Sequence, residues 1–319
     1  MPDKKAHLAL MQEARGASDP VLFLKAIALA HDVTDAEFRF LRSEVLQAVL
    51  AKLQRALRLC DFRNEIVVRP EGVFVDVSGV LMEVSHTQFY LKSSGAASTN
   101  QGEAIQRVLA RMNIPLSTAV DVGANFGEIS LWLARQYPQA RVIAIEPSSD
   151  NLNVLRINKA AQRFPTDGVE IVQEAVCDRS GVVSITKGVG TMNRVVTDGK
   201  ADASETVRCD RLDGIFDRYG VRSADFVKID IEGGEPALKE AIAALGNRVR
   251  SYYIEFSKFA PLGDYLALAQ TLSSRRFVCY DEAASTPLDD LQKIERHLRS
   301  VFAAESTLVT NLWFVAADI

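Results

Sequence analysis

The 319-residue sequence contains no apolar run long enough to cross a bilayer, and its first residues lack the apolar core of a secretion signal. It has four cysteines, none of them in a Cys-x-x-Cys pair, so it gives no support for a zinc or redox site. The net charge of −4 argues against a nucleic-acid partner, which would require clustered lysine and arginine. We therefore expect a cytoplasmic protein with reduced cysteines and no membrane span.

Two patterns that bind nucleotide phosphates are also missing. A dinucleotide fingerprint starting at Gly123 would need glycine at positions 125 and 128, where the chain has Asn125 and Glu128. The Gly-Lys-Ser/Thr of a phosphate-binding loop is absent as well. An oxidoreductase is therefore the least favoured of the cofactor-binding classes.

The segment from Ala119 to Glu128 is the one around which the rest of the chain is organised. An apolar run contains Asp121, then Gly123 and Gly127 alternate with other residues, and an amphipathic pattern begins. This is typical of a buried parallel strand that turns tightly into a helix around a ligand. The two glycines allow positive φ and close approach of the backbone, and the helix start offers unpaired N–H groups.

From residue 101 onward, helical and strand patterns alternate, which predicts an α/β fold with a doubly wound, mostly parallel sheet. Only a long polar helical stretch separates the last two strands, so these two could pair antiparallel. The predicted strands span residues 118–122, 141–145, 169–172, 182–186, 226–230, 252–256, 276–280 and 311–315. The predicted helices span residues 105–112, 126–137 and 265–272, and two more begin at Asp150 and Pro236.

The first hundred residues have a different pattern. Residues 1 to about 60 are predicted to be helical, and strands at 66–68, 73–77 and 89–91 predict a small antiparallel meander. The small, polar segment 93–100 is typical of a linker and places a domain boundary after residue 100. We expect residues 1–100 to form a lid, an acceptor-recognition surface or a homodimer contact, and residues 101–319 to form the second domain.

Two acids follow neighbouring predicted strands, Asp121 and Glu146. A carboxylate where the second strand ends can accept both hydroxyls of a ribose. Asp121 would repel a pyrophosphate at the glycine turn, so a ligand with an ammonium and a sulfonium fits better. The alternative for Asp121 alone is an acid that stabilises the turn or caps the helix.

Four segments together resemble the FkbM family: the Asp121–Gly127 turn, residues 145–147, residues 174–176 and residues 227–235, Val-Lys-Ile-Asp-Ile-Glu-Gly-Gly-Glu. These are S-adenosylmethionine-dependent methyltransferases of the seven-stranded, Rossmann-like class. The resemblance covers roughly residues 101–319. It implies that the last two strands form an antiparallel hairpin and that S-adenosylmethionine is the cofactor.

The resemblance also implies roles for individual residues. The glycine turn would hold the methionine part of the cofactor, Glu146 would bind the ribose, and the segment from Glu174 would meet the adenine through backbone groups. The residues expected to bind the cofactor are Asp121, Gly123, Ala124, Asn125, Gly127, Glu146, Pro147, Glu174, Ala175 and Asp230.

Three carboxylates near predicted strand ends, Asp230, Glu232 and Glu255, are the catalytic candidates. Acids that lie close together raise one another's pKa, which suits a general base. They could also hold a divalent cation, but the family is not generally recognised by a metal motif, so no metal is expected. Glu232 and Glu235 could instead be acids favoured by a helix N-terminus, and we prefer that interpretation for Glu235. Lys228 is expected to pair with one of these acids.

A glycine-rich segment at residues 188–194 lies where family members place the acceptor, which makes Asn193 and Arg194 candidate acceptor contacts. The alternative is an exposed loop with a solvated arginine. The predicted function is O-methylation of a hydroxyl on a glycan, glycoconjugate or secondary metabolite. N-methylation of a small amine and a non-catalytic, cofactor-binding regulatory or scaffold protein are the alternatives.

Overall fold

The computed structural model describes residues 66–69, 72–77, 79–83, 101–186, 204–303 and 307–317. Its contacts divide the chain into two units: residues 1–101 with 156–163, and residues 102–155 with 164–319. The predicted helices before residue 61, the strand at 89–91, the linker at 93–100 and the loop at 188–194 lie outside the described residues.

The first unit contains a three-stranded antiparallel sheet, made of β1 (Ile66–Arg69), β2 (Gly72–Val77) and β3 (Val80–Glu83). The predicted meander is confirmed for its first two strands, and β3 is an additional strand. The second half of α7 (Ser149–Ala161) and the residues after it bind β3, because Asn158 Oδ1 accepts a hydrogen bond from Glu83 N and Gln162 bonds both backbone groups of Leu81.

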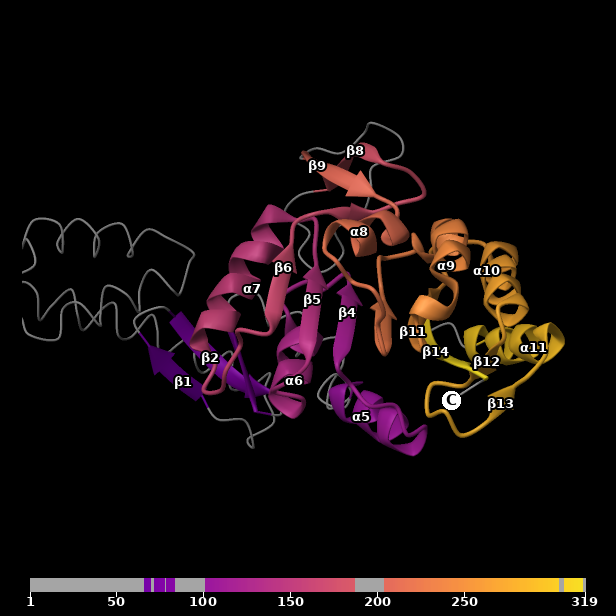
Figure 1. Cartoon of the computed structure of the whole chain (residues 1–319), viewed down its shortest axis with the longest axis horizontal. Coiled ribbons are helices and arrows are strands. Elements are labelled where there is room, and N and C mark those ends of the chain that lie inside the picture. The colour runs from indigo at the N-terminus through magenta and orange to yellow at the C-terminus, as the bar shows by residue number, and fades with distance from the viewer. Residues whose placement is uncertain are drawn as a thin grey trace, which may run out of the picture. The chain divides into compact units, whose positions relative to one another are not determined.

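The second unit is built on an eight-stranded sheet with the order β13-β12-β14-β11-β10-β4-β5-β6 (Figure 1). Its strands are β4 (Thr118–Val122), β5 (Arg141–Ile145), β6 (Val169–Val172), β10 (Phe226–Ile229), β11 (Ser251–Ser257), β12 (Phe277–Tyr280), β13 (Pro287–Leu288) and β14 (Val309–Ala316). Strands β6, β5, β4, β10 and β11 run parallel, and β14 lies antiparallel between β11 and β12. The predicted doubly wound sheet with an antiparallel end is confirmed, and β13 adds a short eighth strand at the edge.

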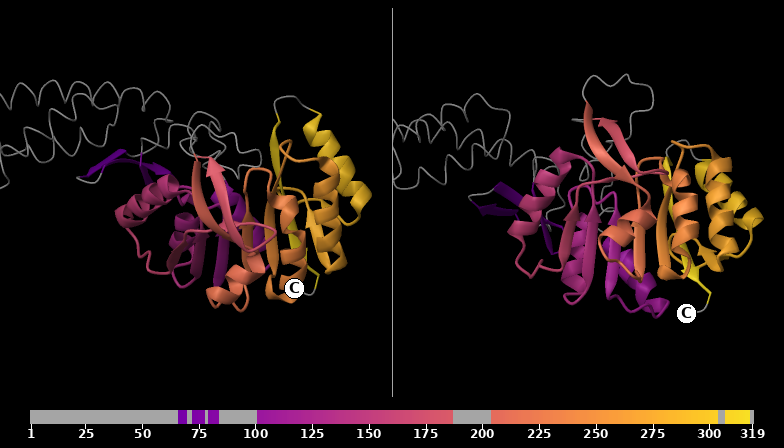
Figure 2. Two further views of the ribbon diagram at one scale, coloured as in Figure 1. Left: turned by 90° about the horizontal axis from the view of Figure 1, so that it is seen from above. Right: turned by 45° about the horizontal axis from the view of Figure 1, so that its top comes forward.

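Helices pack on both faces of this sheet, and Figure 2 shows them from two further directions. The helices of this unit are α5 (Gln101–Arg111), α6 (Glu128–Gln136), α8 (Leu212–Arg218), α9 (Lys239–Leu245), α10 (Leu262–Ser274), α11 (Leu291–Phe302) and the first half of α7, with 3-10 turns η3 (Glu235–Leu238) and η4 (Gly246–Arg248). Side chains from α8 to α11 bury one face of the sheet together with Val120 and Val122. Asp121 alternates with these valines and bonds Ser130 of α6, which places α6 on the opposite face.

A separate three-stranded sheet contains β7 (Ala175–Val176), β9 (Ser204–Asp210) and β8 (Gly181–Thr186), in that order. Figure 1 shows β8 and β9 above the carboxyl ends of β4, β5 and β6. The strand predicted at 182–186 therefore forms, but outside the main sheet. The connection from β6 has no crossover helix, and a parallel neighbour in the same sheet would need a longer one.

Two further findings complete the fold. The helix predicted from Pro236 starts as the 3-10 turn η3, and α9 continues it. Within the described part of the chain, every helix is too short or too polar to serve as a membrane span.

Candidate active site

The strand register brings four residues of the prediction to one edge of the sheet. Val122 pairs with both Ile145 and Ile229, and Ile229 pairs with Ile254. The residues that follow these on their four strands are Gly123, Glu146, Asp230 and Glu255. They lie side by side at the carboxyl ends of parallel strands, which is where open α/β sheets bind ligands.

The turn after β4 requires glycine for two separate reasons. Gly123 and Gly127 have φ values of +79° and +85°, and Asn125 between them also has a positive φ of 51°. A Cβ atom at Gly123 would lie 1.8 Å from the carbonyl oxygen of Asp230, and one at Gly127 would lie 2.9 Å from Leu155 Cγ. The N–H groups of Gly123 and Ala124 both donate to the carbonyl of Ile145. The turn is thus held against the ends of β5 and β10.

Asp121 lies beneath this turn and is 1% exposed. Its Oδ2 accepts a hydrogen bond of 2.6 Å from the Ser130 hydroxyl, whereas its buried Oδ1 has no hydrogen-bond donor. Lys228 Nζ lies 3.7 Å from that Oδ1. Burial raises the pKa of Asp121 above its usual value, although Lys228 and Ser130 oppose the rise. A ligand that brings an N–H donor or a positive charge would satisfy Oδ1.

Glu146 joins the turn to the start of α7. Its Oε2 accepts from Asn125 N at 2.9 Å, and its Oε1 accepts from Ser148 N and from Asn151 Nδ2. Burial raises its pKa to about 7, and these hydrogen bonds oppose the rise. Pro147, between Glu146 and Ser148, is half-buried. Oε2 accepts one hydrogen bond among the described groups and keeps lone-pair capacity for a hydroxyl.

The side chain of Glu174 has a structural role. It is buried, and both of its oxygens bind Arg218 Nη1, at 2.7 and 2.5 Å, while the Tyr219 hydroxyl donates to Oε1. Arg218 also pairs with Asp210 at the end of β9. The adjoining Ala175 pairs with β9. These contacts fix the segment that is expected to meet the adenine, and that expectation stays a prediction.

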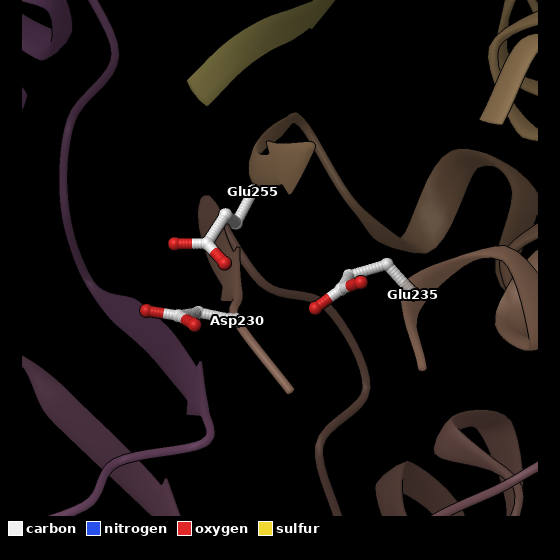
Figure 3. A group of neighbouring side chains, drawn as sticks. All are labelled: Asp230, Glu235 and Glu255. Carbon is white, nitrogen blue, oxygen red and sulfur yellow. The ribbon is translucent and has the colours of Figure 1, made fainter. Parts of the chain in front are cut away.

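The carboxyl groups of Asp230, Glu235 and Glu255 lie close together, with an oxygen of each within 4.8 Å of the others (Figure 3). Glu235 begins η3, as a helix N-terminal acid would, but it is fully buried. Its Oε1 accepts from Ile231 N at 2.7 Å, and its Oε2 accepts from the Tyr265 hydroxyl at 2.8 Å. Three carboxyl groups alone do not define a metal site, and the absence of a metal requirement stays a prediction.

Glu232 and Glu255 complete the predicted catalytic set. Glu232 lies in the turn held by Glu235 and has a positive φ of 57°. Glu255 is half-buried, and its Oε1 is a buried atom without a hydrogen-bond partner. Burial raises the pKa of Glu255 to about 10, and the neighbouring carboxyls of Asp230, Glu235 and Glu232 add to the rise. This carboxyl therefore holds a proton at neutral pH.

Lys228 pairs with acids on two strands. It is 4% exposed, and its Nζ lies 3.0 Å from Asp230 Oδ2 in addition to its contact with Asp121. Lys228 and Asp121 are register partners on neighbouring strands. Burial would lower the pKa of Lys228, but Asp230 and Asp121 together raise it above its usual value, so the side chain is charged.

Glu128 is a candidate that the sequence interpretation treated only as a missing glycine. It lies in the first turn of α6. Burial raises its pKa to about 7, with Lys228 opposing and Asp121 adding to the rise. The available signal was an acid directly after the second glycine of the turn. Asn193 and Arg194, the predicted acceptor contacts, lie outside the described residues.

Residues 121–279 match the model of the methyltransferase FkbM domain. Among curated proteins, methyltransferase sdnD of Sordaria araneosa is 29% identical over 36% of this chain and 56% of its own length. The chain thus matches only about half of that relative.

Among solved structures, precorrin-6y C5,15-methyltransferase from Geobacter metallireducens has a TM-score of 0.37, with 13% identity over 65% of this chain and 81% of that one. The plantazolicin methyltransferase BpumL, in complex with a triazolic desmethylPZN analog and SAH, has a TM-score of 0.39, with 9% identity over 73% and 88% of the two chains. Scores this low carry no argument about the reaction. The family match, by contrast, contains the glycine turn, the acidic strand ends and the carboxylate cluster, and this chain belongs to the FkbM methyltransferase family.

Proposed function

We propose that this chain transfers a methyl group from S-adenosylmethionine to a hydroxyl oxygen of a glycan, glycoconjugate or secondary metabolite. One observation carries the proposal: the glycine turn at Gly123 lies directly against Asp230, so a cofactor-binding turn adjoins a carboxylate suited to take a proton. Membership of the FkbM family supports the same reaction class.

The residues present fit this cofactor. The Gly123 turn leaves no room for a Cβ atom, which is the backbone geometry of a close approach to a ligand. Asp121 Oδ1 is buried and has no hydrogen-bond donor, which an ammonium group would supply. Glu146 is placed at the end of the second strand, where a carboxylate can bind ribose hydroxyls. When bound, the cofactor supplies an electrophilic methyl group on a sulfonium.

The acceptor side of the proposal rests on Asp230. Lys228 Nζ holds one of its oxygens at 3.0 Å, and 28% of the Asp230 side chain is exposed, compared with 5% of Lys228. An acceptor hydroxyl can therefore reach Asp230, which orients it and takes its proton during attack. Because the turn and Asp230 touch, the same scaffold positions donor and acceptor. Such alignment lowers the barrier by about 7–11 kcal/mol at best.

N-methylation of a small amine is the second candidate, favoured by the charge of the site. Asp121, Glu128, Asp230 and Glu255 surround Lys228, which is their one basic neighbour among the groups that shift their pKa values. An excess of carboxyls attracts a cationic amine. A non-catalytic protein that only binds the cofactor is the third candidate, since binding residues do not establish turnover.

Calorimetric titration with S-adenosylmethionine and, separately, with NAD tests the cofactor, with and without magnesium. We expect S-adenosylmethionine alone to bind and Asp121→Ala to abolish binding. The matched control is Asp289→Ala, which removes an exposed acid paired with Lys293 on the surface and should bind normally. No binding of S-adenosylmethionine under any condition would refute the proposal.

Two parts of the proposal concern residues that the structure does not describe. We propose that Asn193 and Arg194 contact the acceptor, and that residues 1–100 form a lid, an acceptor-recognition surface or a homodimer contact. A truncation that starts at residue 101 tests the second part. Unchanged acceptor turnover and an unchanged oligomeric state would contradict it.

A further inference from the structure

We propose that Lys228 holds Asp230 as the ionised base of the site, while the neighbouring Glu255 keeps its proton and donates a hydrogen bond to the acceptor. The two carboxyls would then select a neutral hydroxyl over a protonated amine. Lys228 is a positioning residue in this arrangement, because it acts through Asp230. The inference rests on the proposed function and assigns opposite tasks to two acids on adjacent strands.

Asp230 has a dedicated counter-ion. Lys228 precedes it by two residues on β10, so both side chains lie on the same face of the sheet. The 3.0 Å contact from Nζ to Oδ2 is a charge-assisted hydrogen bond in a buried setting. Because Lys228 is 4% exposed, water competes little for this contact, and the positive charge favours the carboxylate form of Asp230.

Glu255 has no such counter-ion. Its buried Oε1 has no hydrogen-bond donor, and a carboxylate in that position would be costly. The groups that face it are the carboxyls of Asp230, Glu232 and Glu235, and Lys228, which lies at Asp230. On the other side, its register partner Asn311 of β14 donates its amide to Glu282. The pKa of about 10 follows from this arrangement.

A hydroxyl acceptor satisfies both carboxyls at once. A hydroxyl has one donor hydrogen and two lone pairs. Its hydrogen can bond Asp230, one lone pair can accept from protonated Glu255, and the other lone pair remains for attack. The proton passes to Asp230 as the new oxygen–carbon bond forms. The carbon–sulfur bond of the donor breaks, and its electron pair stays on the sulfur.

A protonated amine does not fit the same pair. An alkylammonium carries donors only, so the O–H of Glu255 would have no acceptor, and the amine has no lone pair until it loses a proton. An ammonium beside Glu255 would instead favour the ionised carboxylate. The protonation state of Glu255 therefore distinguishes the two acceptor classes.

Infrared spectroscopy of the full chain tests this without an acceptor. A protonated carboxyl has a carbonyl band distinct from the bands of a carboxylate. At about pH 8.5, ordinary carboxyls are ionised, and so for the most part are Glu128 and Glu146. We expect a protonated-carboxyl band in the wild type that Glu255→Gln removes. We expect Lys228→Met to add intensity, since Asp230 loses its counter-ion, and Lys239→Met, at an exposed lysine paired with Glu240, to add none.

The wild-type protein alone keeps the test decisive if a variant fails to fold. Its band should persist at about pH 8.5 and disappear as the pH approaches the value for Glu255. Absence of the band, or its survival in Glu255→Gln, would overturn the carboxyl pair even if S-adenosylmethionine binds. Failure of S-adenosylmethionine to bind, with the band intact, would overturn the proposed function and with it the acceptor assignment.

Discussion

Gly123 and Asp230 are in backbone contact: a Cβ atom on the glycine would lie 1.8 Å from the carbonyl oxygen of the aspartate. These residues end neighbouring parallel strands, since Val122 and Ile229 are register partners. The turn expected to bind the cofactor and the residue expected to take the acceptor's proton therefore cannot move independently. A change in the backbone of either residue is transmitted to the other.

Gly123→Ala is expected to damage both stability and cofactor binding. The new methyl group would clash with backbone, which cannot swing aside as a side chain can, and φ at this position is +79°. We expect a loss of roughly 3–5 kcal/mol in the free energy of unfolding, measured by urea denaturation. Gly220→Ala is the matched control. Its φ is +64° with open space around it, so strain alone should cost about 1–2 kcal/mol. Equal losses in the two variants would contradict the contact argument.

Arg218→Met is expected to loosen the segment from Glu174 to Val176. Arg218 binds buried Glu174 through two hydrogen bonds and pairs with Asp210, so its loss leaves two acids without their main partner. We expect a destabilisation of about 3 kcal/mol, at the low end for a buried pair because Arg218 is 28% exposed. Calorimetry should also show weaker binding of S-adenosylmethionine.

The matched control for Arg218→Met is Arg179→Met, which removes an exposed arginine paired with Asp178. Surface pairs of this kind contribute little to stability. A stable Arg218→Met variant with normal cofactor affinity would show that the Glu174 segment is held by other contacts and does not depend on this ion pair.

The sequence predicted the bounds of β4, β5 and β6 as the structure has them, because each is a short apolar run between turn residues. It missed β7, β9 and α8. Strand β7 has two residues, too few for any periodicity, and β9 alternates charged and buried residues in a segment rich in polar side chains. The α8 sequence is short and contains Gly214.

The same distinction applies to the site. Asp230 and Glu255 could be placed together from sequence, because the carboxyl ends of parallel strands share an edge. The ion pair of Glu174 with Arg218 joins residues 44 positions apart, and no local pattern predicts it. The protonation of Glu255 was also hidden, since it depends on burial and on which acid Lys228 contacts.

The stability of the folded state is expected to fall as the pH rises from about 5 to 9. Burial raises the pKa to about 7 for Glu128 and Glu146, and to about 10 for Glu255. Between the unfolded and folded pKa values, the folded state binds more protons, so each further rise in pH disfavours it. One such proton corresponds to a slope of up to about 1.4 kcal/mol per pH unit.

Urea denaturation across this pH range measures the slope, and Glu255→Gln should flatten its alkaline part. Asp210 and Asp281 have pKa values lowered below the usual range, so they affect stability only at more acidic pH. A stability that is constant from about pH 7 to 9 would contradict the buried, protonated state of Glu255.

Glu128→Gln is expected to change how cofactor affinity depends on pH. Glu128 ionises near pH 7 and lies close enough to Asp121 for their charges to interact, so its carboxylate should strengthen binding of a cationic cofactor as the pH rises. We expect wild-type affinity for S-adenosylmethionine to increase between about pH 6 and 8, with Glu128 contributing up to about fivefold, equivalent to about 1 kcal/mol. Calorimetry of Glu128→Gln should show a smaller increase, whereas Glu295→Gln, an exposed acid paired with Arg299, should match the wild type. An identical pH dependence in Glu128→Gln and wild type would assign the effect to Glu146, the other acid with a pKa of about 7, and would remove Glu128 from the site.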